Sequence, residues 1–470
     1  MASRFLRPFG LLFAAFLASA ASIAIIFVLM LPGGVPQTAA SVLPARETVA
    51  LFEDVPAERI RDATALFPIL TSAPIYERGS LALIEYSCGD DCSDLGWILF
   101  QKKQDAADSG GTSFSNDRAG GSVVGPWSIR VSSPILLSAL QEGGTGRLLS
   151  LDAFRQGRRA GKEEIYLSLG ILPGPVDLTD HMLSTLLQGS ESMTMAETGS
   201  GWTIFIANPP PMLSPSIPES ILHPPQTNLS MTVGDGRRLW KTMEERMDVP
   251  LRRILYALVG SETEGLLGKD VSFTYDVLPL LQKPFTVHVS KSGSALRYAL
   301  GGSMDDRHQL IQNLEQLHQS VGRSLPTVSL ITRDLDEFRS ILVKQNASLL
   351  EQTEGNEGGW KLRSTRHRET DAGLISATRG DRFALGNDAA LVTALMDDKG
   401  TRTPFPTLYF GGSRSVLAGG IVDLAPWRAE MTWTPWKQMM LGPILRHEGR
   451  LIWHIEKTGN ALVISFQKLD

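Results

Sequence analysis

Both cysteines of the 470-residue chain lie in the stretch SCGDDCSD (87–94). Two thiols separated by three residues can form a disulfide, remain a free pair, or bind copper in a redox site. The flanking runs 81–87 and 95–101 are apolar and strand-prone, which predicts a β-hairpin. Symmetric pairing sets Cys88 opposite Cys92, and directly opposed strand residues lie within disulfide reach. We therefore predict a disulfide between Cys88 and Cys92, with a free pair and a metal or redox site as alternatives.

Known catalytic and cofactor motifs are missing from the sequence. There is no GxSxG nucleophile elbow and no HExxH zinc helix, and the eight histidines are scattered. The stretch 260–270 resembles a phosphate loop, but Leu266 follows Gly265 where that loop requires lysine. We predict a non-catalytic protein without cofactor or metal. An envelope hydrolase whose triad is assembled from distant residues is one alternative, and a carrier of an apolar ligand is another.

An aromatic and methionine-rich cluster near the C-terminus is the best candidate for a binding surface. Its members are Trp427, Trp433, Trp436, Met439 and Met440. Trp and Met are enriched where proteins bind one another, although a hydrophobic core uses the same residues. Pro435 prevents one regular helix across the cluster. The cluster therefore predicts either core packing or a surface for a partner protein, glycan or lipid headgroup.

The N-terminal segment determines where the rest of the chain is expected to be. Residues 8–32 are apolar nearly throughout, and Arg4 and Arg7 precede them. About 24 helical residues span roughly 36 Å, enough to cross a bilayer, and the positive-inside rule keeps the two arginines cytoplasmic. We expect an uncleaved, single-pass anchor in the bacterial inner membrane, with the bulk of the chain periplasmic. A signal peptide cleaved after the small residues at 18–20 is the alternative.

Small residues recur every fourth position in this segment, at Ala14, Ala18 and Ser22. Such a ridge lets two membrane helices approach closely, which suggests a homodimer or a partner helix. A segment that is simply rich in alanine is the alternative.

The charge balance argues against nucleic acid as a partner. The chain has 45 basic and 50 acidic residues, a net charge of −5, and no basic stripe. With 43% hydrophobic residues, the exported part can bury a large core, and its length suggests two or three domains.

Internal repetition is the main organising feature of the sequence. Three stretches share an apolar strand, an acidic residue and an amphipathic helix, and a shorter fourth resembles them: 48–70, 228–255, 415–445 and 164–187. A second pattern, a short strand followed by a helix with Leu and Ala at matching places, occurs at 127–144 and 382–400. The shared order of the two patterns suggests a duplication.

The remaining patterns favour an α+β fold. Alternating runs at 271–276, 284–290, 296–302 and 374–380 are typical of antiparallel strands, and 450–468 reads as a closing hairpin. Apolar residues at helical spacing predict helices at 305–321 and 332–343. We expect two related modules of mainly antiparallel sheet, with helices packed on one face, after an N-terminal transmembrane helix.

The predicted domain boundaries follow changes in composition. Residues 208–228 are rich in proline and read as a spacer between two modules. The segments are a cytoplasmic stub (1–7), the membrane anchor (8–32), a linker (33–46), module one (47–207), the proline-rich linker (208–228), module two (229–400) and a partial third unit packed on module two (401–470).

This arrangement resembles an uncharacterised family of membrane-anchored bacterial proteins, catalogued as a domain of unknown function. The likeness rests on the strand–Asp–helix units and on LISATRGDRFALGNDAALVTAL (374–395). It implies topology and location, and no activity. The function that we predict is a membrane-tethered scaffold or partner-binding protein of the cell envelope, whose partner is another envelope protein.

Overall fold

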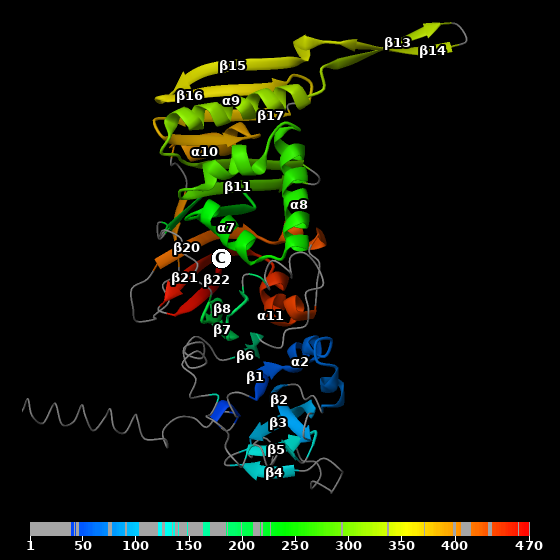
Figure 1. Cartoon of the computed structure of the whole chain (residues 1–470), viewed down its shortest axis with the longest axis vertical. Helices are drawn as coiled ribbons and strands as arrows, with labels where there is room; N and C mark the ends of the chain where they lie inside the picture. Colours follow the sequence, from blue (N-terminus) through cyan, green and yellow to red (C-terminus); the bar gives the residue numbers. More distant parts are fainter. Residues whose placement is uncertain are drawn as a thin grey trace, which may run out of the picture.

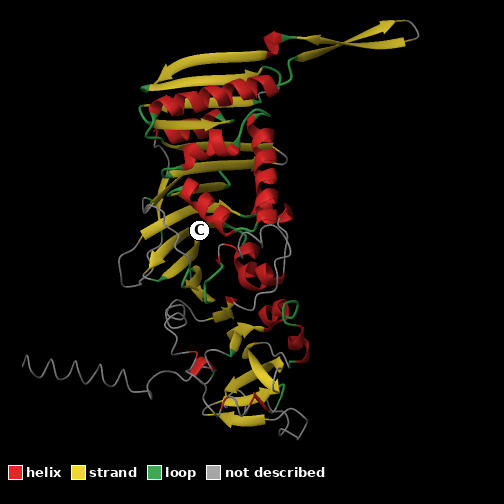
Figure 2. Ribbon diagram, viewed as in Figure 1, coloured by secondary structure: helices red, strands yellow, loops and turns green. Residues whose placement is uncertain are grey.

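The structure is a computed structural model of the whole chain (Figures 1 and 2). It describes residues 39–41, 43, 47–73, 78–89, 92–102, 121–124, 127–133, 135–136, 140, 148, 163–169, 185, 187–198, 200–209, 217, 220–225, 227–292, 295–335, 338–370, 372–397, 401–405, 415–430, 435–458 and 460–469.

One 18-stranded sheet runs through these residues, and every neighbouring pair of its strands is antiparallel. Figure 1 shows the strands stacked along the long axis of the molecule. From one end to the other they are β4 (Gly121–Val124), β5 (Trp127–Val131), β3 (Cys92–Lys102), β2 (Arg78–Gly89), β1 (Thr48–Pro56), β6 (Glu163–Ser168), β7 (Ser192–Thr198), β8 (Gly201–Ala207), β22 (Ala461–Leu469), β21 (Arg450–Thr458), β20 (Ser415–Asp423), β10 (Leu229–Val233), β11 (Phe285–Ser292), β12 (Ala295–Ser303), β18 (Arg382–Gly386), β17 (Gly373–Arg379), β16 (Trp360–His367) and β15 (Leu350–Glu357).

Two small ladders stand outside the main sheet. They are β9 (Ser220–His223) with β19 (Thr401–Pro404), and β13 (Val328–Leu335) with β14 (Phe338–Gln345). The α-helices are α2 (Ala57–Ala63), α7 (Gly236–Arg246), α8 (Val249–Leu267), α9 (Arg307–Ser324), α10 (Ala389–Asp397) and α11 (Pro435–Arg446). Shorter turns are η2 (Ala39–Ser41), η3 (Pro68–Ser72), η6 (Phe273–Val277), η7 (Leu278–Leu281), η8 (Ala347–Leu349) and η9 (Ala425–Glu430).

The sheet consists of two topologically equivalent halves. In space, the first half reads β4-β5-β3-β2-β1-β6-β7-β8. The second half reads β17-β18-β12-β11-β10-β20-β21-β22, and β16 and β15 extend its outer end. The last strands of the two halves, β8 and β22, pair antiparallel with Ile204 opposite Ile464. Equivalent strands paired in this way relate the halves by an approximate two-fold axis.

The repeated sequence patterns map onto equivalent places in the two halves. The stretches 48–70 and 228–255 contain the strand–helix pairs β1–α2 and β10–α7, respectively. The stretch 382–400 contains the pair β18–α10. The stretches 164–187 and 415–445 begin with the equivalent strands β6 and β20. The residues predicted as a third unit supply β20, β21 and β22, which correspond to β6, β7 and β8 of the first half.

Helices cover both faces of the sheet. Leu314 and Leu317 of α9 pack in one apolar cluster with Leu385 of β18, whereas Leu391 of α10 packs in another cluster with Ala384. Adjacent residues of a strand point to opposite faces, so α9 and α10 lie on opposite sides. The largest cluster unites residues of β1, β6, β7 and β8 with residues of β20, β21, β22, α2 and α11.

The predicted fold class is therefore wrong in its main features. The described chain is mostly one antiparallel sheet, not two modules, because β8 pairs with β22 across the predicted linker and one core spans both halves. The physical reason is that all seven residues of β8 are buried, so this strand needs neighbours on both edges and packing on both faces. The prediction that helices lie on one face is also wrong, as α10 shows.

Two local predictions also need correction. The stretch 332–343, predicted as a helix, lies in the hairpin of β13 and β14; its β-branched Ile, Thr and Val residues favour strands over the helical spacing. The stretch 271–276, predicted as a strand, contributes to η6. The other helix (α9) and the closing hairpin (β21–β22) are found as predicted.

The predicted transmembrane helix is not among the helices of the described residues. Within the described part of the chain, no helix combines the length and the apolar character that crossing a membrane requires. Residues 8–32, where that helix was predicted, lie outside the described residues.

Candidate functional site

Strand β15 forms the outer end of the sheet in the second half. β15 pairs with β16 on one side and with no other described strand. Seven of its eight residues are exposed, and its register with β16 contains no bulge. An edge strand of this kind carries unpaired N–H and C=O groups that can accept a further strand.

A glycine turn determines which backbone groups face outward. Gly358 and Gly359 have φ values of 55° and 81°, which match the two-residue turn that links antiparallel strands. Glu357 and Trp360, on either side of the turn, are paired residues and form the hydrogen-bonded pair that closes such a hairpin. Alternation along the strand then directs the N–H and C=O groups of Gln352, Glu354 and Asn356 toward the free edge.

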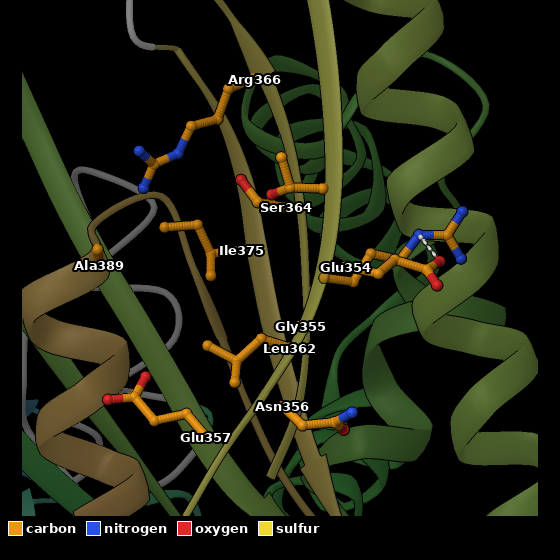
Figure 3. A pocket seen from close by; sticks show the side chains of 11 residues that line it. Glu354, Gly355, Asn356, Glu357, Leu362, Ser364, Arg366, Ile375 and Ala389 are labelled. Carbon is orange, nitrogen blue, oxygen red and sulfur yellow. Dashed lines mark ion pairs between the residues drawn. The ribbon is translucent and has the colours of Figure 1, made fainter.

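A groove lies on the α10 face of the same strands, with a volume of about 360 Å³ (Figure 3). Leu362 of β16, Ile375 of β17 and Ala389 of α10 line its apolar part. Figure 3 shows Glu354 on the opposite side of the strands from Leu362 and Ile375. Gly355 of β15 has no atom within 4 Å of the position that a Cβ would take. A side chain of an added strand could therefore pass over Gly355 into the groove.

The charged residues at this end of the sheet are segregated by strand, and the glutamates of β15 are called the acidic row here. β15 carries Glu351, Glu354 and Glu357, whereas β16 carries Lys361, Arg363 and Arg366. Glu354 and Arg363 are opposite each other and form a partly exposed ion pair of 3.9 Å. A pair near the surface contributes only about 0.2–1 kcal/mol. The outermost row is acidic, which favours a ligand that carries basic residues.

A buried polar network lies under the β9–β19 ladder. Ser230 of β10 is fully buried, and its Oγ lies 3.0 Å from Nδ1 of both His223 and His288. A hydroxyl has one proton, so at most one of these nitrogens accepts from it and at least one donates to it. Thr227 completes the network through its hydroxyl, which lies 3.0 Å from Ser230 Oγ.

Burial keeps both imidazoles neutral. Desolvation, with a smaller contribution from the neighbouring His223, lowers the pKa of His288 to about 4. Desolvation, with the charge of Arg450, lowers the pKa of His223 to about 4 as well. His288 is fully buried, so a substrate reaches neither this imidazole nor Ser230. The network packs the fold and does not provide a nucleophile.

Two other buried histidines, one beside two hydroxyls and one beside a carboxylate, are equally inaccessible. His318 of α9 lies 2.7 Å from Ser376 Oγ through Nε2 and 3.0 Å from Thr365 Oγ1 through Nδ1. His454 lies 3.5 Å from Glu456, and both are buried within β21. Among the described residues, no group of three or more His, Cys, Asp or Glu could hold a metal ion.

The predicted tryptophan–methionine surface is only partly visible. Met439 is fully buried in the large core, so its assignment to a partner surface is wrong. Trp427 is half-buried in η9 and its ring lies 5.0 Å from the ammonium of Lys291. Trp433 and the side chains of Trp436 and Met440 lie outside the described residues. Pro435 is the first residue of α11, which fits the predicted helix break.

The two cysteines flank the tip of the β2–β3 hairpin, as the sequence predicts. Ser87 is opposite Ser93, and a shift in register then places Gly89 opposite Cys92. The predicted pairing of Cys88 with Cys92 is therefore displaced by one residue at the tip. The side chains of both cysteines lie outside the described part, so the disulfide stays a prediction. Ala14, Ala18 and Ser22 lie outside it as well.

Sequence reasoning missed the open end of the sheet. The residues of β15, LEQTEGNE, are almost all polar and lack the alternation that marks a half-buried strand. The available signal was Gly358-Gly359 between two eight-residue runs, a typical sequence for a two-residue hairpin turn.

Comparison with family models, with curated proteins and with solved structures gives no match to this chain.

Proposed function

We propose that this protein is a non-catalytic scaffold that binds an extended segment of a partner protein at β15. The observation that carries the proposal is the free edge of an eight-residue, bulge-free and exposed strand. Main-chain hydrogen bonds to such an edge supply affinity, and pockets for alternate side chains supply specificity. The groove lined by Leu362, Ile375 and Ala389 offers one such pocket.

The chemistry of the end strand specifies the ligand further. Its acidic row, Glu351, Glu354 and Glu357, favours a segment that carries lysine or arginine. An apolar side chain on the groove face of that segment would contact Leu362 and Ile375. The ligand class is thus an extended peptide with basic residues and at least one apolar anchor.

The test uses peptides selected from a displayed random library against the purified full chain. Glu354→Pro removes an N–H that faces the free edge, and proline is tolerated there because that N–H is not part of the ladder. We expect this variant to lose at least tenfold in peptide affinity by calorimetry, equivalent to about 1.4 kcal/mol. Glu354→Ala, which keeps the N–H, serves as the matched control and should retain most of the affinity. Equal binding by the proline variant, or no selected peptide at all, would rule out strand addition at β15.

A further inference from the structure

The hairpin of β13 and β14, called the arm here, projects from the molecule beside the β15 end of the sheet (Figure 1). In the described part of the chain, each of its strands pairs only with the other. Half of its sixteen residues are Val, Leu, Ile or Phe. Leu330 is opposite Val343, and the next pair is Ile331 with Leu342. Both of these consecutive pairs consist of apolar residues.

A two-stranded ribbon of this composition is not expected to stand alone in water. An isolated hairpin is marginally stable at best, and it gains stability from further strands or from packing. Neither outer backbone edge of the arm pairs with another described strand, so both edges are open to pairing. These properties indicate that the arm contacts a binding partner in solution.

Residues 346–349 form a corner between β14 and β15, and this corner directs the arm away from the β15 strand of its own chain. The N–H of Asn346 donates to the carbonyl of Thr327 across the base, at 2.6 Å. The Ser348 hydroxyl donates to Asn346 Oδ1 at 2.6 Å, and Leu349 is buried at the end of η8. Folding the arm back onto β15 of the same chain would break this corner. Pairing with another copy leaves it intact.

Charge supplies a second reason for pairing between copies. β14 carries Arg339 and Lys344 and no acidic residue, whereas β15 carries three glutamates and no basic residue. On its other side, β15 already faces the basic strand β16, where Arg363 pairs with Glu354. A basic strand added to the free edge would therefore continue the alternation of basic and acidic strands.

We propose that β14 of one copy adds antiparallel to the free edge of β15 in a second copy of this chain. Both strands have eight residues, so an end-to-end alignment sets Phe338 opposite Glu357 and Lys344 opposite Glu351. Arg339 then lies opposite Asn356, diagonal to Glu354. Cross-strand and diagonal neighbours of opposite charge stabilise such a pair. This inference rests on the proposed function of β15 as a strand acceptor and names its partner.

The experiment measures self-association of the full chain by analytical ultracentrifugation over a range of protein concentrations. The arm variant, Arg339→Glu with Lys344→Glu, sets an acidic arm against an acidic edge. The edge variant, Glu351→Lys with Glu354→Lys, sets a basic arm against a basic edge. Each variant alone should associate roughly tenfold more weakly than the wild type, because attractive cross-strand pairs become repulsive.

An equimolar mixture of the two variants should restore association. In the mixture, the acidic arm of one meets the basic edge of the other, and the reverse contact pairs basic arm with acidic edge. Restoration also shows that both variants are folded. A wild-type chain that stays monomeric at every concentration, or variants that associate as tightly as the wild type, would overturn the proposal.

The two proposals fail in different ways. If the wild type is monomeric but binds selected peptides in a manner lost in Glu354→Pro, then β15 accepts strands and the arm is not its partner. If Glu354→Pro associates as tightly as Glu354→Ala, then the copies do not pair through the β15 edge and the arm proposal fails.

Discussion

At the scale of single residues, the buried histidines explain more about stability than about chemistry. His223, His288 and His318 each have a pKa lowered to about 4, chiefly because burial disfavours the charged ring. In the described part of the chain, Nε2 of His288 has no hydrogen-bond partner. A second proton would therefore leave a buried charge and an unpaired N–H, which the fold does not compensate.

The sign of the pH dependence follows from these lowered pKa values. These histidines take up a proton near pH 6.5 in the unfolded state and only near pH 4 in the folded state. Their contribution to the unfolding free energy is therefore complete above pH 6.5 and is lost as the pH falls toward 4. Each histidine contributes a loss of up to about 1.4 kcal/mol per pH unit in that window. His318→Gln should flatten the dependence of the unfolding free energy on pH, measured with urea at pH 7 and pH 5. The control is exposed His308→Gln on the same helix, and an equal effect of both variants would contradict the assignment.

At the scale of elements, the sequence predicts local structure well and pairing between distant strands poorly. The β2–β3 and β21–β22 hairpins and α9 follow from alternation and helical spacing within short windows. The contact of β8 with β22 joins residues more than 250 apart along the chain, and no local pattern specifies it. The helix predicted for 332–343 in the arm is wrong because Leu335, Phe338 and Ile341 have helical spacing by coincidence.

The pairing of β8 with β22, which joins the two halves, is sensitive to added side-chain volume at Gly201. A Cβ at this position would lie 2.0 Å from the carbonyl oxygen of Phe466 in β22. Gly201→Ala should therefore reduce the unfolding free energy by about 1–3 kcal/mol in a urea titration, because backbone atoms must move. The matched control is Gly260→Ala in α8, where a Cβ meets no atom within 4 Å. That change should stabilise by about 0.5–1 kcal/mol. A neutral effect at Gly201 would show that β8 and β22 do not pair as described.

At the scale of the whole molecule, duplication accounts for the architecture and leaves one feature unexplained by it. The two halves correspond strand for strand, but β15, β16 and the arm occur only in the second half of the described chain. The candidate site lies in this addition and not in the repeated part. The sequence reveals the repeats through their strand–helix patterns, whereas the polar residues of β15 give no sign that a free edge ends the sheet. The periplasmic location stays a prediction.

Hydrogen exchange of the β15 amides reports directly whether a strand is added at this edge. Free full-length chain carrying Arg339→Glu and Lys344→Glu is compared with the same chain saturated by a selected peptide, residue by residue. We predict that the amides of Gln352, Glu354 and Asn356 slow by at least tenfold on binding, because they gain a partner strand. The amides of Thr353 and Gly355, already paired with β16, should change little. Protection elsewhere with unchanged exchange at Gln352, Glu354 and Asn356 would contradict the account.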